Sequence, residues 1–198
     1  IGAGTMGNGI AQACAVSGIN VVMVDISDAA VQKGVATVAG SLERLIKKDK
    51  ITAADKDAAL ARIKGSTSYD DLKAAQIVIE AATENHELKL KILKQVDAIV
   101  APEVIIASNT SSISITKLAA SSGRPEKVIG MPFMNPVPVM KLVEIVRGLP
   151  TADATYQTTI DLAQRFGKTT VAARDIPGFI VNRVLIPLLN EACYALYE

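Results

Sequence analysis

The sequence has no tryptophan, only 4% aromatic residues and a single histidine, while 49% of its 198 residues are hydrophobic. The core must therefore be aliphatic. No apolar run reaches the roughly 18 residues that a membrane-spanning helix needs, and no secretory hydrophobic segment opens the chain. These features predict a globular, cytoplasmic protein that contacts no membrane.

Charge and cysteine content argue against a general nucleic-acid-binding protein and against a disulfide-rich protein. The net charge is only +1, which gives no general attraction to nucleic acid. The two cysteines, Cys14 and Cys193, lie far apart inside predicted helices. They are therefore expected to be reduced core thiols and not a disulfide framework.

The most informative stretch is the first 25 residues. Gly2, Gly4 and Gly7 have the G-x-G-x-x-G spacing, and a predicted helix and an apolar run follow, ending on Asp25. The glycines would form a tight turn, let the backbone approach a pyrophosphate and let helix and sheet pack closely. Asp25 would accept hydrogen bonds from ribose hydroxyls. This favours NAD over NADP, because none of residues 26–28 is a cation that could bind a 2′-phosphate. The alternative is a tight turn in an unrelated α/β sheet.

Apolar periodicity predicts the remaining elements. Helices are expected over 27–50, 52–63, 86–100 and 155–166, and short buried strands over 76–82, 104–107, 127–133, 141–146 and 169–173. Such apolar strands are typical of a parallel sheet covered by helices on both faces. The sequence therefore predicts a Rossmann-type, doubly wound, mostly parallel α/β fold with a helical hairpin insertion. Pro136 and Pro138 are expected to hold the connection 134–140 extended and rigid.

The pattern changes at Asp175. A long apolar helix is expected to run to Glu198, with Pro177 near its first turn and Pro187 as an internal kink. We expect residues 1–175 to form the NAD-binding domain and 176–198 to be the first helix of an all-α C-terminal domain. Both ends look cut, so a fragment of a longer protein is expected.

Polar residues follow two of the predicted strands. Glu84 comes shortly after strand 76–82, and the cluster Ser108–Ser112 follows strand 104–107. Because ligands bind outside the carboxyl ends of parallel strands, both groups are expected in the crevice of the glycine turn.

Five motifs together resemble one family: residues 2–7, 82–85, 108–112, 135–144 and 177–183. With them the chain resembles the 3-hydroxyacyl-CoA dehydrogenases, especially the bacterial 3-hydroxybutyryl-CoA dehydrogenases. The resemblance implies NAD-dependent oxidation of the 3-hydroxyl of a short-chain (S)-3-hydroxyacyl-CoA, in butyrate, polyhydroxybutyrate or β-oxidation metabolism. It also implies a C-terminal helical domain, a homodimer when full length, and the bacterial cytoplasm.

The resemblance also assigns roles to residues. Ser111 and Asn182 would hydrogen-bond the substrate oxygens, and Glu144 would orient a histidine that acts as general base. NAD contacts are implied for Gly2, Gly4, Thr5, Met6, Gly7, Asp25, Glu84, Lys89, Asn109, Ser111 and Asn135. CoA contacts are implied for Ser41 and Lys48, and Lys48 or Arg44 could hold a CoA phosphate. By charge alone the basic segment 41–50 would be a solvated helix end. No metal site is implied.

One position departs from the family pattern. Pro132 occupies the place of the catalytic histidine, twelve residues before Glu144. Proline has no proton-accepting side chain, and loss of a general base typically costs about 10²–10⁴ in rate. Pro132 is an engineered or accidental substitution, a sequence error, or the mark of a natural variant that binds without turnover. We favour the first two, since Ser111, Glu144 and Asn182 are retained.

Nothing in the sequence places the only histidine, His86, where it could act as the base. We expect His86 to be a surface or helix-cap residue. The leading hypothesis is thus a dehydrogenase impaired by Pro132. The alternatives are a catalytically silent module that binds NAD and acyl-CoA, and a two-domain NAD enzyme acting on hydroxy acids without CoA.

Overall fold

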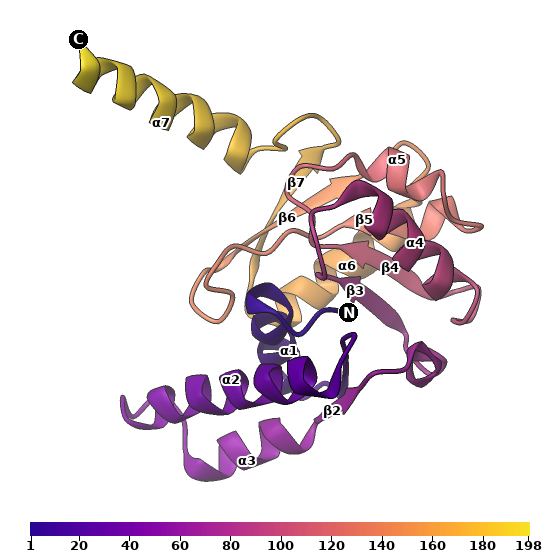
Figure 1. Ribbon diagram of the computed structural model, residues 1–198, viewed down its shortest axis with the longest axis vertical. Helices are drawn as coiled ribbons and strands as arrows, with labels where there is room; N and C mark the ends of the chain where they lie inside the picture. Colours follow the sequence, from indigo (N-terminus) through magenta and orange to yellow (C-terminus); the bar gives the residue numbers. More distant parts are fainter.

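The computed structural model describes residues 1–198, and its strands form two groups (Figure 1). One group pairs β1 (Val21–Val24) with β2 (Ile63–Ser66). The other has the order β3 (Ile77–Glu80), β4 (Ile105–Ser108), β5 (Val128–Gly130), β6 (Leu142–Arg147) and β7 (Thr169–Arg174). Every pair is parallel except β5 with β6. The predicted mostly parallel α/β sheet is confirmed.

Helices cover both faces of the larger sheet. The α-helices of the protein are α1 (Thr5–Val16), α2 (Asp28–Ile46), α3 (Ala53–Ala61), α4 (His86–Asp97), α5 (Ile115–Ala119), α6 (Asp153–Arg165) and α7 (Val181–Tyr197). Side chains of α4 and α5 share one aliphatic cluster with residues of the sheet. Side chains of α1 and α6 share a second cluster, which holds alternate residues of the same strands, such as Ile105 and Ala107. Period-two alternation sends these strand side chains to opposite faces, so the sheet has a core on each side.

The glycine turn joins the two groups of strands. Gly2 N–H donates to Val24 O at 2.7 Å, while Ala81 N–H donates to Ile1 O at 2.8 Å. Residues 1–2 therefore lie between the ends of β1 and β3. Next to them an apolar cavity of about 600 Å³ is lined by both strands and by α1.

The α2–α3 hairpin forms where the sequence predicts it. Ser27 accepts from Ala30 N–H as the N-cap of α2, and Thr52 caps α3 in a box with Asp55. The predicted second helix is too long, however, because α3 ends at Ala61 and Ile63 begins strand β2.

One other prediction is wrong. The connection 134–140 is not extended: Val139 and Met140 N–H both donate to Pro136 O, which makes a turn, and the Asn135–Pro136 peptide is cis. Pro177 lies just before the first turn of α7, in a separate turn over 177–180 that precedes Val181.

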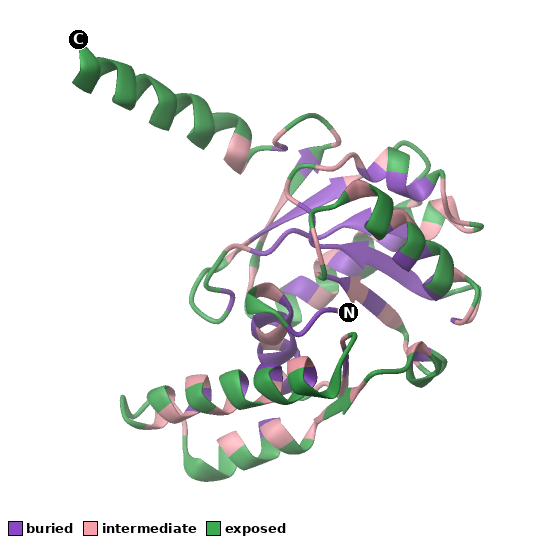
Figure 2. Ribbon diagram, viewed as in Figure 1, coloured by how far each residue is buried: buried purple, intermediate pink, exposed green.

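Helix α7 projects away from the rest of the molecule, and none of its residues is buried (Figures 1 and 2). Its exposed apolar side chains include Val184, Leu185, Ile186, Leu188, Leu189, Tyr194, Leu196 and Tyr197. Cys193 is exposed on it as well, so of the two cysteines only Cys14 is the core thiol that the sequence predicts. No helix of the protein combines the length and the hydropathy needed to cross a membrane.

Candidate functional site

The glycine turn has the shape of an anion-binding loop. Gly2 has a φ of +95°, and a Cβ added at Gly7 would lie 1.8 Å from the Gly2 carbonyl oxygen, so neither position accepts a side chain. Gly4 is the N-cap of α1 and provides no side-chain acceptor for the first turn. The first N–H groups of α1 are therefore free to donate to a pyrophosphate.

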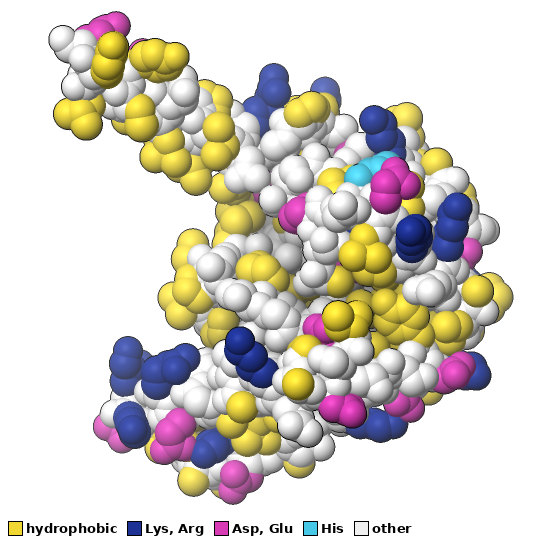
Figure 3. All heavy atoms as spheres, in the orientation of Figure 1, with side chains coloured by type: hydrophobic (Ala, Val, Ile, Leu, Met, Phe, Trp, Pro, Cys, Tyr) yellow, Lys and Arg dark blue, Asp and Glu magenta, His cyan; other side chains and the backbone are white.

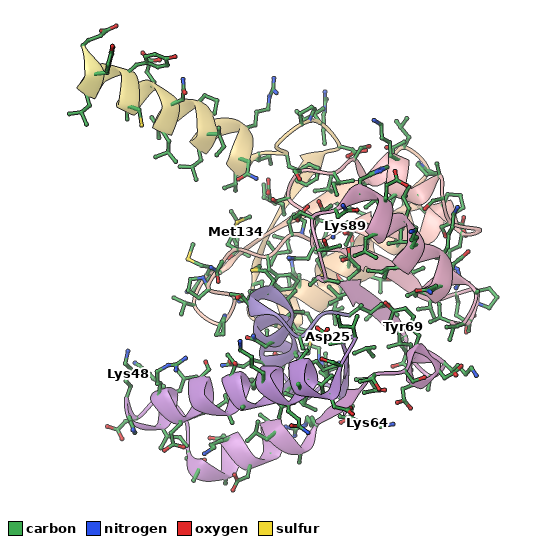
Figure 4. The ribbon with its side chains drawn as sticks, viewed as in Figure 1. Asp25, Lys48, Lys64, Tyr69, Lys89 and Met134 are labelled. Carbon is green, nitrogen blue, oxygen red and sulfur yellow. The ribbon has the colours of Figure 1, made fainter.

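Asp25 lies at the end of β1, directly beside this turn (Figure 4). One carboxylate oxygen accepts from Ala3 N–H at 2.6 Å and the other from Ile26 N–H at 2.7 Å. These two bonds fix the carboxylate, which retains free lone pairs for ribose hydroxyls. The residues present thus fit the NAD site that the sequence predicts.

The polar cluster after β4 is held by Glu84. The Glu84 carboxylate accepts from Thr110 Oγ1 at 2.8 Å, from Ser111 N–H at 3.3 Å and from Ser112 Oγ at 3.4 Å. Asn109, in the same cluster, accepts from Phe133 N–H at 2.8 Å. The two polar groups expected to share a crevice therefore do contact each other.

Asn182 reaches the same loop from the first turn of α7. Its Nδ2 donates to Ser111 O at 3.3 Å, although the two residues are 71 positions apart. The side chain of Asn182 thereby contacts the backbone of Ser111, and these are the two residues that the resemblance assigns to the substrate oxygens.

Pro132 and Glu144 are neighbours across an antiparallel pairing. Gly130 pairs with Val146 and Phe133 with Val143, so residue 132 stands opposite residue 144. Glu144 N–H donates to Pro132 O at 3.2 Å, and both residues are buried. Side chains in such opposite positions have Cβ atoms about 5 Å apart. A side chain at position 132 therefore lies within reach of the Glu144 carboxylate.

The Glu144 carboxylate has partners in the absence of an imidazole. It is 2% exposed, and its Oε1 accepts from Ile180 N–H at 2.7 Å and from Val181 N–H at 3.1 Å. These donors belong to the start of α7. Glu144 therefore connects the sheet to the helix that carries Asn182.

Residues 1–176 match the family model described as 3-hydroxyacyl-CoA dehydrogenase, NAD binding domain. The chain belongs to the 3-hydroxyacyl-CoA dehydrogenase family. It is accordingly an NAD-binding oxidoreductase domain of fatty acid and butanoate metabolism.

Three relatives illustrate the match. The 3-hydroxybutyryl-CoA dehydrogenase of Bradyrhizobium diazoefficiens is 48% identical over 198 residues, which are all of this chain and 68% of that protein. The crystal structure of (S)-3-hydroxybutyryl-CoA dehydrogenase from Ralstonia eutropha is 70% identical, with a TM-score of 0.95 over 96% of this chain and 68% of that one. The fatty acid oxidation complex subunit alpha of Acinetobacter baylyi is 46% identical over 187 residues, which are 94% of this chain but 26% of that protein.

Within this dehydrogenase domain, Lys89 is in an unexpected place for a predicted NAD contact. Its side chain is 1% exposed, and its ammonium donates to Glu80 Oε2 at 2.5 Å. The same oxygen also accepts from Ser108 Oγ at 2.9 Å. Figure 4 shows Lys89 at α4, within the body of the molecule. The contact of Lys89 with NAD stays a prediction, and its buried ion pair with Glu80 is a contact that the sequence analysis missed.

The predicted CoA residues lie at the C-terminal end of α2, with Ser41 and Arg44 in the helix and Lys48 just after its C-cap. Arg44 and Lys48 are exposed and make no ion pair, and Ser41 is half-buried. Figure 3 shows Lys and Arg side chains gathered at this end of the hairpin. In Figure 4 Lys48 and Met134 lie on the same side of the molecule, and Met134 precedes Asn135 in the turn 134–140. The basic end is therefore available to an anion, and its contact with CoA stays a prediction.

His86 makes no hydrogen bond or ion pair with Pro132 or Glu144. It is the first residue of α4, with Asn85 as the N-cap, and its Nδ1 lies 3.3 Å from Glu87 Oε1. Its Nε2 is buried without a hydrogen-bond partner. The ring lines a cavity of about 370 Å³ together with Ser112, Lys117 and Asp175.

Proposed function

We propose that this domain catalyses the NAD-dependent interconversion of short-chain (S)-3-hydroxyacyl-CoA and 3-ketoacyl-CoA, at a rate lowered by Pro132. The reaction would take place in the crevice between the glycine turn, the Ser111 loop and the first turn of α7. The observation that carries the proposal is the position of residue 132, which stands opposite Glu144 while Asn182 contacts the Ser111 loop.

Each residue of the crevice has a chemical role in this proposal. Bound NAD supplies the acceptor for the hydride that leaves C3 of the substrate. Ser111 and Asn182 hold the oxygen on C3 by hydrogen bonds, and Glu144 would orient an imidazole at position 132 that takes the hydroxyl proton. Proline cannot accept that proton, so the expected loss is about 10²–10⁴ in rate.

We further propose that 1–175 is the NAD-binding domain and that 176–198 begins an all-α domain. The support is the apolar character of α7, whose large side chains are exposed in this chain. A helix of that composition needs a partner surface, and a homodimer of the full-length protein would supply one.

One observation favours the silent binding module as a second candidate. Retention of a buried glutamate is by itself an argument for catalysis, but here the Glu144 carboxylate caps the start of α7. Glu144 thus has a structural reason to be present without any imidazole.

NADH oxidation with acetoacetyl-CoA separates the two candidates when this chain is compared with its Pro132→His variant. A rise of about 10² or more in the variant supports a dehydrogenase that lacks its base. Equal activity in both proteins refutes the assigned mechanism, because the proton then goes elsewhere. If both are inactive while NADH and acetoacetyl-CoA still bind, the silent binding module is the better account.

A further inference from the structure

Asp175 makes three hydrogen bonds to a distant part of the chain. It directly follows β7, and its Oδ1 accepts from Ile115 N–H at 2.9 Å. Its Oδ2 accepts from Thr116 N–H and from Ser114 Oγ, both at 2.8 Å. The carboxylate therefore caps α5, and it ties the end of the sheet to the segment that follows Ser111.

The chain after Asp175 is fixed as well. Gly178 and Phe179 have φ values of +78° and +47°, which is a left-handed conformation that a phenylalanine rarely adopts. Phe179 is 3% exposed and belongs to the same aliphatic cluster as Ile115. Packing therefore holds this turn in a strained conformation, and it leads into the N–H groups that Glu144 accepts.

These contacts connect the two residues to which the proposed function assigns the substrate oxygen, Ser111 and Asn182. Ser111 comes three positions before Ser114, and Asn182 comes seven positions after Asp175. The two segments also contact each other directly, because Asn182 Nδ2 donates to Ser111 O. A change at Asp175 would therefore shift the loop of Ser111 and the first turn of α7 relative to each other.

We infer that Asp175 is a positioning residue that sets the separation of Ser111 and Asn182 for the 3-oxygen of the acyl-CoA. The inference rests on the function proposed above. Only a carboxylate has acceptors on both oxygens for three donors, because an amide would turn an NH₂ group toward one of them. His86 and Lys117, the other titratable groups in the cavity beside Asp175, make no hydrogen bond to it.

The test uses the ¹⁵N-labelled chain and three variants. Asp175→Asn removes part of the acceptor set, whereas Ser114→Ala leaves the Asp175 carboxylate in place and removes one of its donors, together with the acceptor that Ser114 Oγ offers to Lys117 N–H. Asp161→Asn, at an exposed acid on α6, is the control with the same change of charge. For each protein we would measure amide exchange at residues 115 and 116, the side-chain NH₂ signals of Asn182, and calorimetric affinities for NADH and acetoacetyl-CoA.

In Asp175→Asn we expect exchange at residues 115 and 116 to accelerate on the order of tenfold, the effect of one charge-assisted hydrogen bond. The Asn182 signals should shift, and acetoacetyl-CoA should bind about tenfold more weakly. NADH affinity should change by less than about twofold, since the glycine turn is untouched. Ser114→Ala should show smaller changes in the same direction, and Asp161→Asn none.

Unchanged Asn182 signals and acetoacetyl-CoA affinity in Asp175→Asn would overturn the inference and leave a simple helix cap. A parallel loss of NADH affinity would also overturn it, because it would indicate general loss of structure. If Asp175→Asn does not fold, Ser114→Ala decides by the same signals. If the unchanged chain does not bind acetoacetyl-CoA, the proposed function fails, and the Asn182 signals alone decide whether Asp175 positions the pair.

Discussion

Glu144 donates its N–H to the carbonyl of Pro132, and Pro132 cannot return the bond because it has no N–H. In an antiparallel pair of this kind the two residues normally exchange both hydrogen bonds. Pro132 therefore offers neither a backbone donor nor a proton acceptor, directly opposite a buried carboxylate. The β5–β6 connection lacks one hydrogen bond there, and in the proposed function the same residue leaves the site without a base.

The cap that Glu144 places on α7 can be tested apart from catalysis. Glu144→Gln keeps an oxygen that can accept from Ile180 and Val181, whereas Glu144→Leu removes it. We expect the leucine variant to lose about 1–2 kcal/mol in the free energy of unfolding, as for loss of a helix N-cap. The glutamine variant should lose much less. Urea denaturation measures both, and equal losses would show that charge, not the acceptor, stabilises this position.

The buried pair of Lys89 and Glu80 gives a second prediction. Both side chains are 1% exposed, so removing one charge leaves the other without compensation. Lys89→Met should cost about 3–5 kcal/mol in the free energy of unfolding. The double variant Lys89→Met, Glu80→Leu should recover a large part of that loss, although Ser108 Oγ and Ala82 N–H then lack their acceptor. A double variant less stable than Lys89→Met would contradict this account.

Sequence patterns reveal contacts between nearby residues and miss contacts between distant ones, as the caps of α3 and α5 show. Thr52 and Asp55 lie three residues apart and form a capping box on α3, and the helix that the sequence analysis expects begins at residue 52. At α5 the corresponding position after Ser114 is Lys117, and the acid comes from Asp175, about 60 residues away. No local pattern contains that contact, so Asp175 is read only as a domain boundary.

The same distinction applies to strands. The run at β4 is continuously apolar and is predicted, with an error of one residue at its ends. Strand β2 reads Ile63-Lys64-Gly65-Ser66 and has no apolar run. It is a strand because β1 offers an edge, on which Val21 pairs with Ile63 and Val24 with Ser66. Tertiary pairing overrides its weak intrinsic preference.

Acid should weaken the contact between Asp97 and Arg124. Although burial alone would raise the pKa of Asp97, hydrogen bonds from Gly123 N–H and from Arg124 hold that pKa below its usual value. A carboxyl group with a lower pKa in the folded state stabilises the fold above its unfolded pKa of about 3.9. That stabilisation is lost as the pH falls through the folded pKa.

The free energy of unfolding, measured by urea denaturation between pH 6 and pH 3, should therefore decrease less steeply in Asp97→Asn than in the unchanged protein. The control is Glu87→Gln, at an exposed carboxylate whose side chain is 79% accessible. Identical slopes for Asp97→Asn and the unchanged protein would show that this carboxyl group does not titrate on unfolding.

The basic end of α2 should bind the phosphates of CoA and contribute nothing to binding the rest of the substrate. Arg44 and Lys48 are exposed and unpaired, so each can contribute about 0.5–1 kcal/mol to binding a phosphate at low salt. Arg44→Ala with Lys48→Ala should weaken acetoacetyl-CoA by about tenfold and leave NADH affinity unchanged. The loss should shrink at high ionic strength, since exposed charges are screened.

Acetoacetyl-pantetheine, which lacks the nucleotide phosphates, should bind both proteins equally. Lys91→Ala, on the exposed face of α4, is the control, and an equal loss there would mean that only net charge matters.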